Sequence, residues 1–161
     1  MRSLWRRLSA WPGGKFLFSQ IVGYVIPYTG SMRASVEQLQ PGHAVVRLRD
    51  RRRVRNHLRS IHAIALANLA EFTTGLATLS GMPDSARAIL VGLEIEYSKK
   101  ARGDIVGECI TSIPETDERQ EYRVEVTLRD SDADIVATAW ARWLIGPQKA
   151  DMQAQATPDP S

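Results

Sequence analysis

A single carboxylate within a long apolar segment is the residue of this chain that is best suited to acid–base chemistry. Glu71 lies in the segment 61–80, where leucine, isoleucine, phenylalanine and alanine fill most positions. An ionised carboxylate in such surroundings is costly unless it has partners. Loss of water also raises its pKa toward the range of a general base. The alternative is a polar network, since Asn68 and Thr74 recur with Glu71 at a spacing of three.

Polar side chains also precede this segment. Asn56 and His57 lie shortly before it, and His62 lies at its start. His62 and Glu71 are nine residues apart, which places them nearly opposite on a helical wheel. They cannot form a dyad within one helix, and this favours a site assembled from two chains. The plainer interpretations are that His62 hydrogen-bonds at the helix start and that His57 is an ordinary loop residue.

The metal-binding residue types are few. Three histidines and one cysteine have no standard zinc spacing, so we expect no metal and no other cofactor. Cys109 has no second cysteine with which to form an intrachain disulfide. We expect it to be a small core residue of a cytoplasmic protein.

Positive charge is concentrated near the polar residues. The net charge is +3, but residues 47–59 hold seven arginines against one aspartate, which gives +6 and leaves −3 for the rest. Such a patch indicates a solvated face or a phosphate-bearing partner such as CoA. Lys99, Lys100 and Arg102 form a second cationic group with the same two interpretations. No aromatic residue is interleaved with the arginines, which argues against nucleic acid.

Hydrophobic periodicity predicts the elements that must position these residues. Helices are predicted at about 2–10 and 14–25, and a long buried helix over 61–80 with Ser60 as its N-cap. Two-residue alternation predicts the strands, at 33–39, 43–49, 89–97, 103–113, 122–129 and 134–145. The turns 99–103 and 130–133 are predicted to close hairpins. The tail from residue 148 is predicted to be disordered.

This order predicts an α+β fold, in which an antiparallel sheet of five to six strands wraps around one central helix. Such a sheet must cover its edge strands, and dimerisation by edge pairing is one way to do so.

The N-terminal segment is basic and rich in tryptophan and leucine, and residues 1–36 contain no Asp or Glu. An amphipathic helix there would cover either a membrane surface or the domain itself. The apolar run 16–26 is too short to span a bilayer. It lacks the cleavage site of a signal peptide.

The stretch 55–71 resembles the signature of hotdog-fold thioesterases of the phenylacetate-pathway type and, more closely, a DUF4442-like branch of that superfamily. The matching residues are Asn56 in the loop, His62 at the helix opening and the acidic Glu71 two turns inside the helix. The resemblance implies a hotdog domain over 30–147, with an N-terminal helical segment over 1–29.

The resemblance also implies what the residues do. Such proteins are homodimers with active sites at the subunit interface, and dimers can pair into tetramers. The amide of Ala63 would polarise the carbonyl of an acyl-CoA or acyl carrier protein thioester. The partner's Glu71 would act as general base or nucleophile, and Asn56 would orient the water or the carbonyl. Substrate contacts would come from a wider set: His57, Arg59, Asn68, Thr74, Lys99, Lys100 and Arg102.

The chain departs from the pattern where the family places glycine, because Arg59, Ala63 and Ile64 surround the helix start. A missing glycine restricts the approach of a thioester to the backbone. We therefore keep two alternatives beside acyl-CoA hydrolysis. One is a protein that binds acyl chains or acyl-CoA without turnover. The other is a hotdog dehydratase, which lacks support because its His-Phe-Pro-Gly loop is absent.

Overall fold

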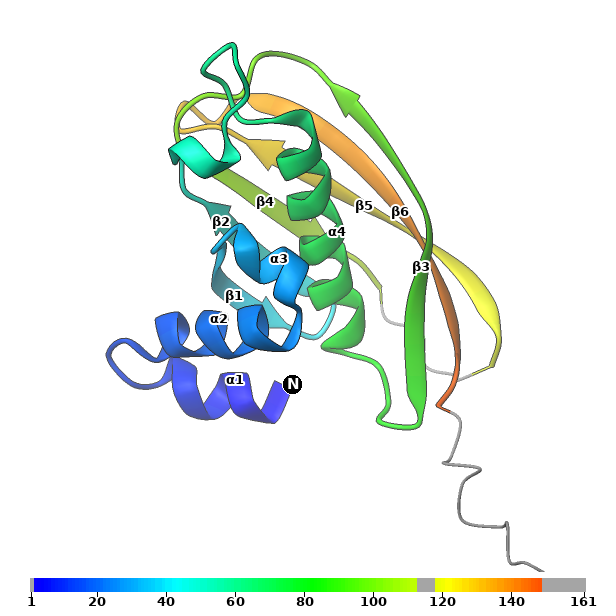
Figure 1. Cartoon of the computed structure of the whole chain (residues 1–161). Helices are drawn as coiled ribbons and strands as arrows, with labels where there is room; N and C mark the ends of the chain where they lie inside the picture. The colour runs from blue at the N-terminus through cyan, green and yellow to red at the C-terminus, as the bar shows by residue number, and fades with distance from the viewer. Residues whose placement is uncertain (1, 113–117, 149–161) are drawn as a thin grey trace, which may run out of the picture.

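The computed structural model describes residues 2–112 and 118–148. One antiparallel sheet has a long helix across one face and shorter helices beside it (Figure 1). The helices are α1 (Arg2–Ser9), α2 (Gly14–Val25), α3 (Pro27–Ser31), the 3₁₀ turn η1 (Arg52–Val54) and α4 (Ala63–Leu79). The strands are β1 (Ser35–Gln40), β2 (His43–Leu48), β3 (Ala86–Tyr97), β4 (Ile105–Ile110), β5 (Gln120–Arg129) and β6 (Ile135–Pro147).

The predicted α+β architecture is confirmed. The six strands are ordered β1-β2-β4-β5-β6-β3, and every neighbouring pair is antiparallel. Helix α4 packs on all six strands, and its inner face meets the buried side chains of the sheet. Figure 1 shows α4 across the sheet, with β3 at one edge and β1 near the N-terminal helices at the other.

One connection differs from the prediction. The turn 99–103 does not close a hairpin, because β3 pairs with β6 and β4 pairs with β2 and β5. Three strand spacings of about 4.8 Å separate β3 from β4, and the residues between them are enough to cross that distance. This loop is held just after the end of β2, because the Gly103 amide donates to the Asp50 carboxylate. The hairpin at 130–133 is confirmed, since β5 and β6 are neighbours.

The start of the central helix is the second correction. Helix α4 begins at Ala63, and its N-cap is His62, whose Nδ1 accepts a hydrogen bond from the Ile64 amide at 3.1 Å. The prediction of Ser60 as N-cap is wrong, because its hydroxyl donates to Asn56 in the preceding loop. The side-chain pattern could not distinguish the two, since both residues are able to accept from an amide.

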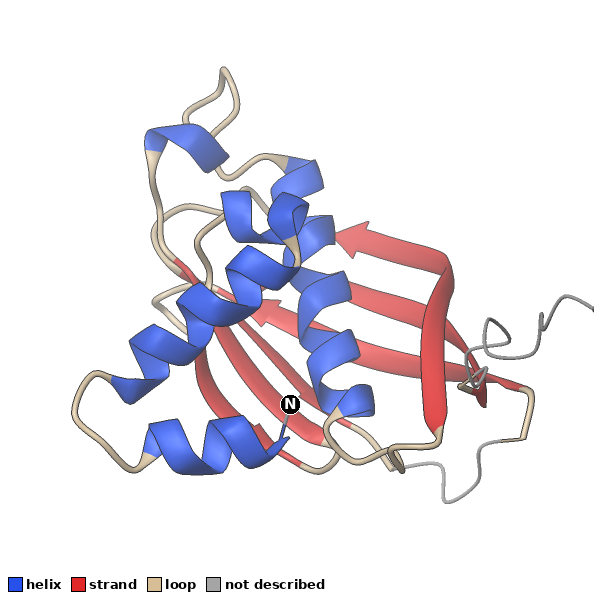
Figure 2. Cartoon of the chain, turned by 60° about the horizontal axis from the view of Figure 1, so that its bottom comes forward, coloured by secondary structure: helices blue, strands red, loops and turns tan. Residues whose placement is uncertain are grey.

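The N-terminal helices cover the β1 end of the sheet (Figure 2). Trp5 of α1 meets Phe18 of α2 edge to face, with ring centroids 5.0 Å apart. The Ser19 hydroxyl accepts from the Val36 amide of β1 at 2.9 Å. The sequence pattern does not predict the short helix α3, whose first residue is Pro27; proline suits the first turn of a helix. Within the described residues, no helix is both long and apolar enough to cross a membrane.

Candidate functional site

The loop before α4 is organised by the side chain of Asn56. Its Oδ1 accepts from the Leu58 amide at 2.9 Å and from both the amide and the hydroxyl of Ser60 at 3.2 Å. The backbone amide of Asn56 donates to the Ser60 carbonyl at 2.8 Å, but its side-chain Nδ2 has no acceptor within the described part of the chain. Asn56 therefore fixes the loop through its oxygen and keeps its Nδ2 donor for another group.

The beginning of α4 presents one backbone donor. The Ile64 amide is capped by His62, and the amides of Ala65 and Leu66 donate to the His62 carbonyl. The Ala63 amide has no acceptor among residues 2–112 and 118–148. It lies at the positive end of the helix dipole, where a carbonyl oxygen that gains negative charge is stabilised.

Glu71 is half-buried on the face of α4 that the sheet leaves open. Its carboxylate makes no hydrogen bond or ion pair within the described residues. Burial raises the pKa of this carboxyl, and no neighbouring cation offsets the effect. A carboxylate whose pKa is raised accepts a proton more readily, as a general base does.

The polar side chains near Glu71 form hydrogen bonds with other groups. The Thr29 hydroxyl of α3 donates to the Asn68 Oδ1 at 3.1 Å. The Thr74 hydroxyl donates to main-chain carbonyls of α4 and accepts from the Trp143 indole at 3.3 Å. Within one chain, the predicted network of Asn68, Glu71 and Thr74 therefore does not include the carboxylate.

One chain does not bring the Ala63 amide and Glu71 together. At a rise of 1.5 Å per residue, the separation of eight positions places them about 12 Å apart along α4. Two groups that act on one carbonyl carbon and its oxygen must lie within a few ångströms of each other. A site that uses both therefore needs a second chain.

A cavity of about 200 Å³ lies beside the helix start. His62 and Asn68 line it together with Arg53 and Arg55 from the arginine-rich segment and with Tyr28 of α3. Glu71 is not among its lining residues. The structure thus groups two of the predicted residues with the arginines, apart from the carboxylate.

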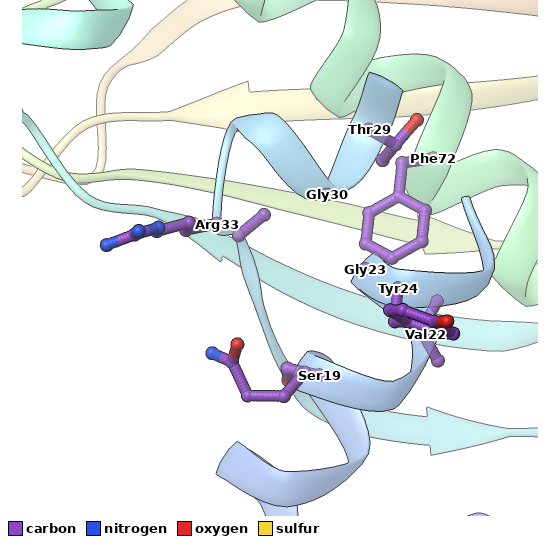
Figure 3. A pocket seen from close by; sticks show the side chains of 10 residues that line it. Ser19, Val22, Gly23, Tyr24, Thr29, Gly30, Arg33 and Phe72 are labelled. Atoms are coloured by element: carbon purple, nitrogen blue, oxygen red, sulfur yellow. The ribbon is translucent and has the colours of Figure 1, made fainter. Parts of the chain in front are cut away.

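The neighbouring Phe72 faces a second cavity, of about 330 Å³, between α2, α3 and α4. Figure 3 shows the Phe72 ring close to Thr29, and Arg33 on the far side of this cavity. The lining is a mixture of apolar and small polar residues. The segment next to Glu71 thus borders an open cavity.

The remaining predicted residues lie on or near the Asn56 loop. His57 and Arg59 are exposed, and Arg59 has a positive φ of 57°, in the left-handed region that favours glycine. Lys100 and Arg102 are exposed. Between them, the Ala101 carbonyl accepts a hydrogen bond from the Ile61 amide. These two cations therefore lie near the Asn56 loop.

Lys99 differs, because its ammonium group pairs with Asp130 at 2.8 Å and Asp134 at 2.6 Å. Hydrogen bonds to both carboxylates raise its pKa. Its charge is balanced within the chain, and a phosphate would have to compete with two carboxylates.

Sequence reasoning missed Tyr97. Its hydroxyl donates to the Ala63 carbonyl at 3.0 Å and so ties the end of β3 to the first turn of α4. Partial burial raises the pKa of the Tyr97 hydroxyl. The alternating pattern placed Tyr97 in a strand, but it could not indicate the contact of its hydroxyl with the start of α4.

Cys109 is buried in the core, as predicted. Burial, with a smaller effect of Glu125, raises the pKa of its thiol to about 12. The thiolate that a nucleophile requires is therefore disfavoured. No group of three His, Cys, Asp or Glu side chains in the described part of the chain lies close enough to hold a metal ion.

Comparison with known proteins places this geometry in a family. None of the curated proteins matches the sequence. The structural-genomics protein APC5556 shares 30% identity over 90% of this chain and 96% of its own, with a TM-score of 0.78. PA5026 of Pseudomonas aeruginosa, described as a probable thioesterase, shares 22% over 82% and 95%, with a TM-score of 0.72.

A more distant neighbour has the same fold. The thioesterase HI1161 of Haemophilus influenzae shares 9% identity over 78% of this chain and 86% of its own, with a TM-score of 0.68. The sheet around α4 is thus a hotdog fold, as the resemblance implied. Residues 14–145 match the model of DUF4442, a domain of unknown function, and the chain therefore belongs to the DUF4442 family.

Proposed function

We propose that this protein is a homodimeric thioester hydrolase that acts on acyl-CoA. Each of its two sites would combine the Ala63 amide and Asn56 of one subunit with Glu71 of the other. The observation that carries the proposal is the Glu71 carboxylate, which is half-buried and has no polar partner within the described residues. Similar solved structures include two described as thioesterases and one described as a probable thioesterase, and this supports the reaction class.

The reaction follows from these groups. The Ala63 amide would stabilise the negative charge that the thioester oxygen gains when the carbonyl carbon is attacked. Glu71 would take a proton from the attacking water, and Asn56 Nδ2 would hold the water or the carbonyl. The carbon–sulfur bond then breaks, the CoA thiol leaves, and the acyl group leaves as a carboxylic acid.

The free edge of β3 supports the dimer. Within the described residues this strand pairs only with β6, and Ile89 and Val91 are exposed on it. A long unpaired edge is a template for another strand. Antiparallel pairing of two β3 strands would also make the two α4 helices antiparallel, so that the start of one faces toward the partner helix.

The cationic residues near the Asn56 loop would hold the phosphates of CoA. Lys100, Arg102 and Arg53 are the candidates, and His57 and Arg59 lie on the loop itself. Arg55 is already paired with Asp50 at 2.6 Å. Exposed cations of this kind bind phosphate with an affinity that falls as salt increases. The cytoplasmic setting expected from the single cysteine belongs to this proposal as well.

Thiol release from a panel of acyl-CoAs tests the function. Glu71→Gln keeps the shape of the side chain and removes the base, so hydrolysis should fall by a factor of about 10²–10⁴. Glu108→Gln is the matched control, since Glu108 lies on β4 and pairs with His43. Absence of hydrolysis by the parent, or equal rates for parent and Glu71→Gln, would refute the proposed hydrolase.

A second candidate is a protein that holds acyl-CoA without turnover. The observation that favours it is Arg59, which occupies a glycine-like backbone conformation and brings a large side chain to the helix start. Native mass spectrometry of the purified protein would then show a bound acyl-CoA or fatty acid, while the thiol assay shows no release. A protein that hydrolyses the same compound excludes this candidate.

A further inference from the structure

Helix α2 has apolar side chains on both of its faces. Phe18 and Val22 are buried against the domain, whereas Phe16, Leu17 and Tyr24 on the opposite face are 67%, 49% and 87% exposed. A helix that is apolar all round is normally buried on all sides. The outward face of α2 is therefore an apolar surface that the chain itself leaves uncovered.

The same surface continues beyond the two ends of α2. Trp11 lies before the helix and is 74% exposed, and Tyr28 follows it and is 70% exposed. Seven of the fifteen large hydrophobic residues that are exposed in the described part of the chain lie between residues 11 and 28. Exposed apolar residues scattered singly need no explanation, but a contiguous group marks a binding surface.

Positive charge surrounds this surface. Residues 1–36 contain no Asp or Glu. Arg6 and Arg7 of α1 and Lys15 of α2 are exposed. The surface is thus apolar at its centre and cationic at its rim.

A cavity of about 370 Å³ lies beside it, lined by Phe16 together with Arg33, Arg49 and Arg51. None of these three arginines forms an ion pair within the described residues. Arg51 donates to two main-chain carbonyls, one of them that of Arg33 at 2.8 Å. Three guanidinium groups held together without carboxylate partners form a site for anionic groups such as phosphate.

The electrostatics of Arg51 agree with this description. Burial lowers the pKa of its guanidinium, and the charges of Arg33, Arg49 and Arg53 lower it further, while Asp104 offsets part of the effect. An anion bound in this cavity would relieve the repulsion among the arginines.

We propose that the outward face of α2, with Trp11 and Tyr28 at its ends and Arg33, Arg49 and Arg51 beside it, binds the surface of an anionic phospholipid bilayer. Aromatic rings suit the membrane–water interface, and a basic rim suits anionic headgroups. The helix lies on the bilayer and does not cross it, because its 12 residues span about 18 Å.

The charge of this surface favours a bilayer over a second copy of the chain as its binding partner. Two copies joined through this face would bring the cationic rims of both together, and like charges repel at short distance. The surface also lies at the β1 end of the sheet, whereas the free edge proposed for dimerisation is β3 at the other end. The bilayer contact is therefore independent of the proposed hydrolysis.

Flotation of the full-length protein with vesicles tests the proposal. We expect binding to vesicles of phosphatidylcholine and phosphatidylglycerol, and weaker binding to phosphatidylcholine alone or at high salt. The double variants Phe16→Ser/Tyr24→Ser and Arg33→Glu/Arg49→Glu should each lower the bound fraction at least about tenfold.

Matched controls make the same kinds of change at exposed residues elsewhere. The apolar control is the double variant Ile110→Ser/Ile135→Ser, on the sheet. The charge control is Arg87→Glu/Arg119→Glu, near the β3 edge. Both controls should bind as the parent does, and circular dichroism should show that all four variants are folded.

Three results would overturn the proposal. In the first, the parent remains unbound on anionic vesicles. In the second, the controls lose as much binding as the α2 variants. In the third, Phe16→Ser/Tyr24→Ser lowers the molecular mass in solution without vesicles, which identifies a second copy as the occupant.

Discussion

Glu71 lies half-buried without a polar partner in the described chain, and burial raises its pKa. If it is the general base, its deprotonated form is active, so kcat/KM should rise with pH through the raised pKa. The midpoint should lie above the ordinary glutamate value of about 4.3. Rates measured between about pH 4 and 8 check this. A flat profile with an active parent would show that Glu71 does not act as a base.

The same residue gives a prediction for stability. A carboxyl whose pKa is raised on folding stabilises the folded state only at low pH, and this contribution is lost as pH rises through the folded pKa. Glu71→Gln should therefore raise the free energy of unfolding at about pH 7.5 and have little effect at about pH 4. Urea unfolding at both values measures the difference. A loss of stability at the higher pH would mean that the carboxylate has a favourable partner.

Ala63 allows the backbone donor to be removed without loss of the helix. Proline is tolerated at the first helical position, and His62 before it is already extended, with φ −65° and ψ 138°. Ala63→Pro should remain folded but lower kcat/KM about 10²–10³-fold. Ala63→Ser keeps the amide and is the control. Equal rates for Ala63→Pro and Ala63→Ser would exclude this amide as the donor.

At the level of elements, the packing of α4 on β6 depends on a close approach. A Cβ added at Gly75 would meet the Trp143 ring at 3.1 Å. Gly75→Leu should therefore destabilise the protein by about 1–3 kcal/mol. Ala67→Leu is the control, since Ala67 lies on the more open side of α4. Thermal unfolding compares them, and a Gly75→Leu protein as stable as the control would contradict the packing described here.

The elements themselves were largely predictable. Two-residue alternation located all six strands, and the apolar segment around Glu71 located α4. The pairing of β3 with β6 was not predictable, because a turn between two strands indicates a hairpin and carries no information about a crossover to a distant edge. The contact of Tyr97 with Ala63 depends on that crossover and was missed for the same reason.

The site was predictable in part. The apolar surroundings of Glu71 indicated a partly desolvated carboxylate, and a half-buried carboxylate is what the structure has. The engagement of Lys99 by two aspartates was not predictable, because these lie more than 30 residues away in the sequence. The roles of Asn56, His62 and Ala63 stay predictions, since their chemistry depends on a second chain.

At the level of the whole molecule, the free edge of β3 predicts a dimer. Lysine on an exposed edge strand opposes pairing with another strand. Ile89→Lys/Val91→Lys should therefore convert a dimer into a monomer of 17.9 kDa and abolish hydrolysis. Ile110→Lys on β4, which is equally apolar and more exposed, should do neither. Sedimentation gives the mass, and a monomeric parent would exclude the interface.

A mixing experiment tests the shared site most directly. Ala63→Pro and Glu71→Gln chains are each inactive alone if every site needs both groups. When they are refolded together in equal amounts, half of the dimers are mixed, and each mixed dimer has one intact site. The account predicts that the mixture recovers about a quarter of the parent rate. A mixture that forms mixed dimers but stays as inactive as its components would contradict a site shared between two chains.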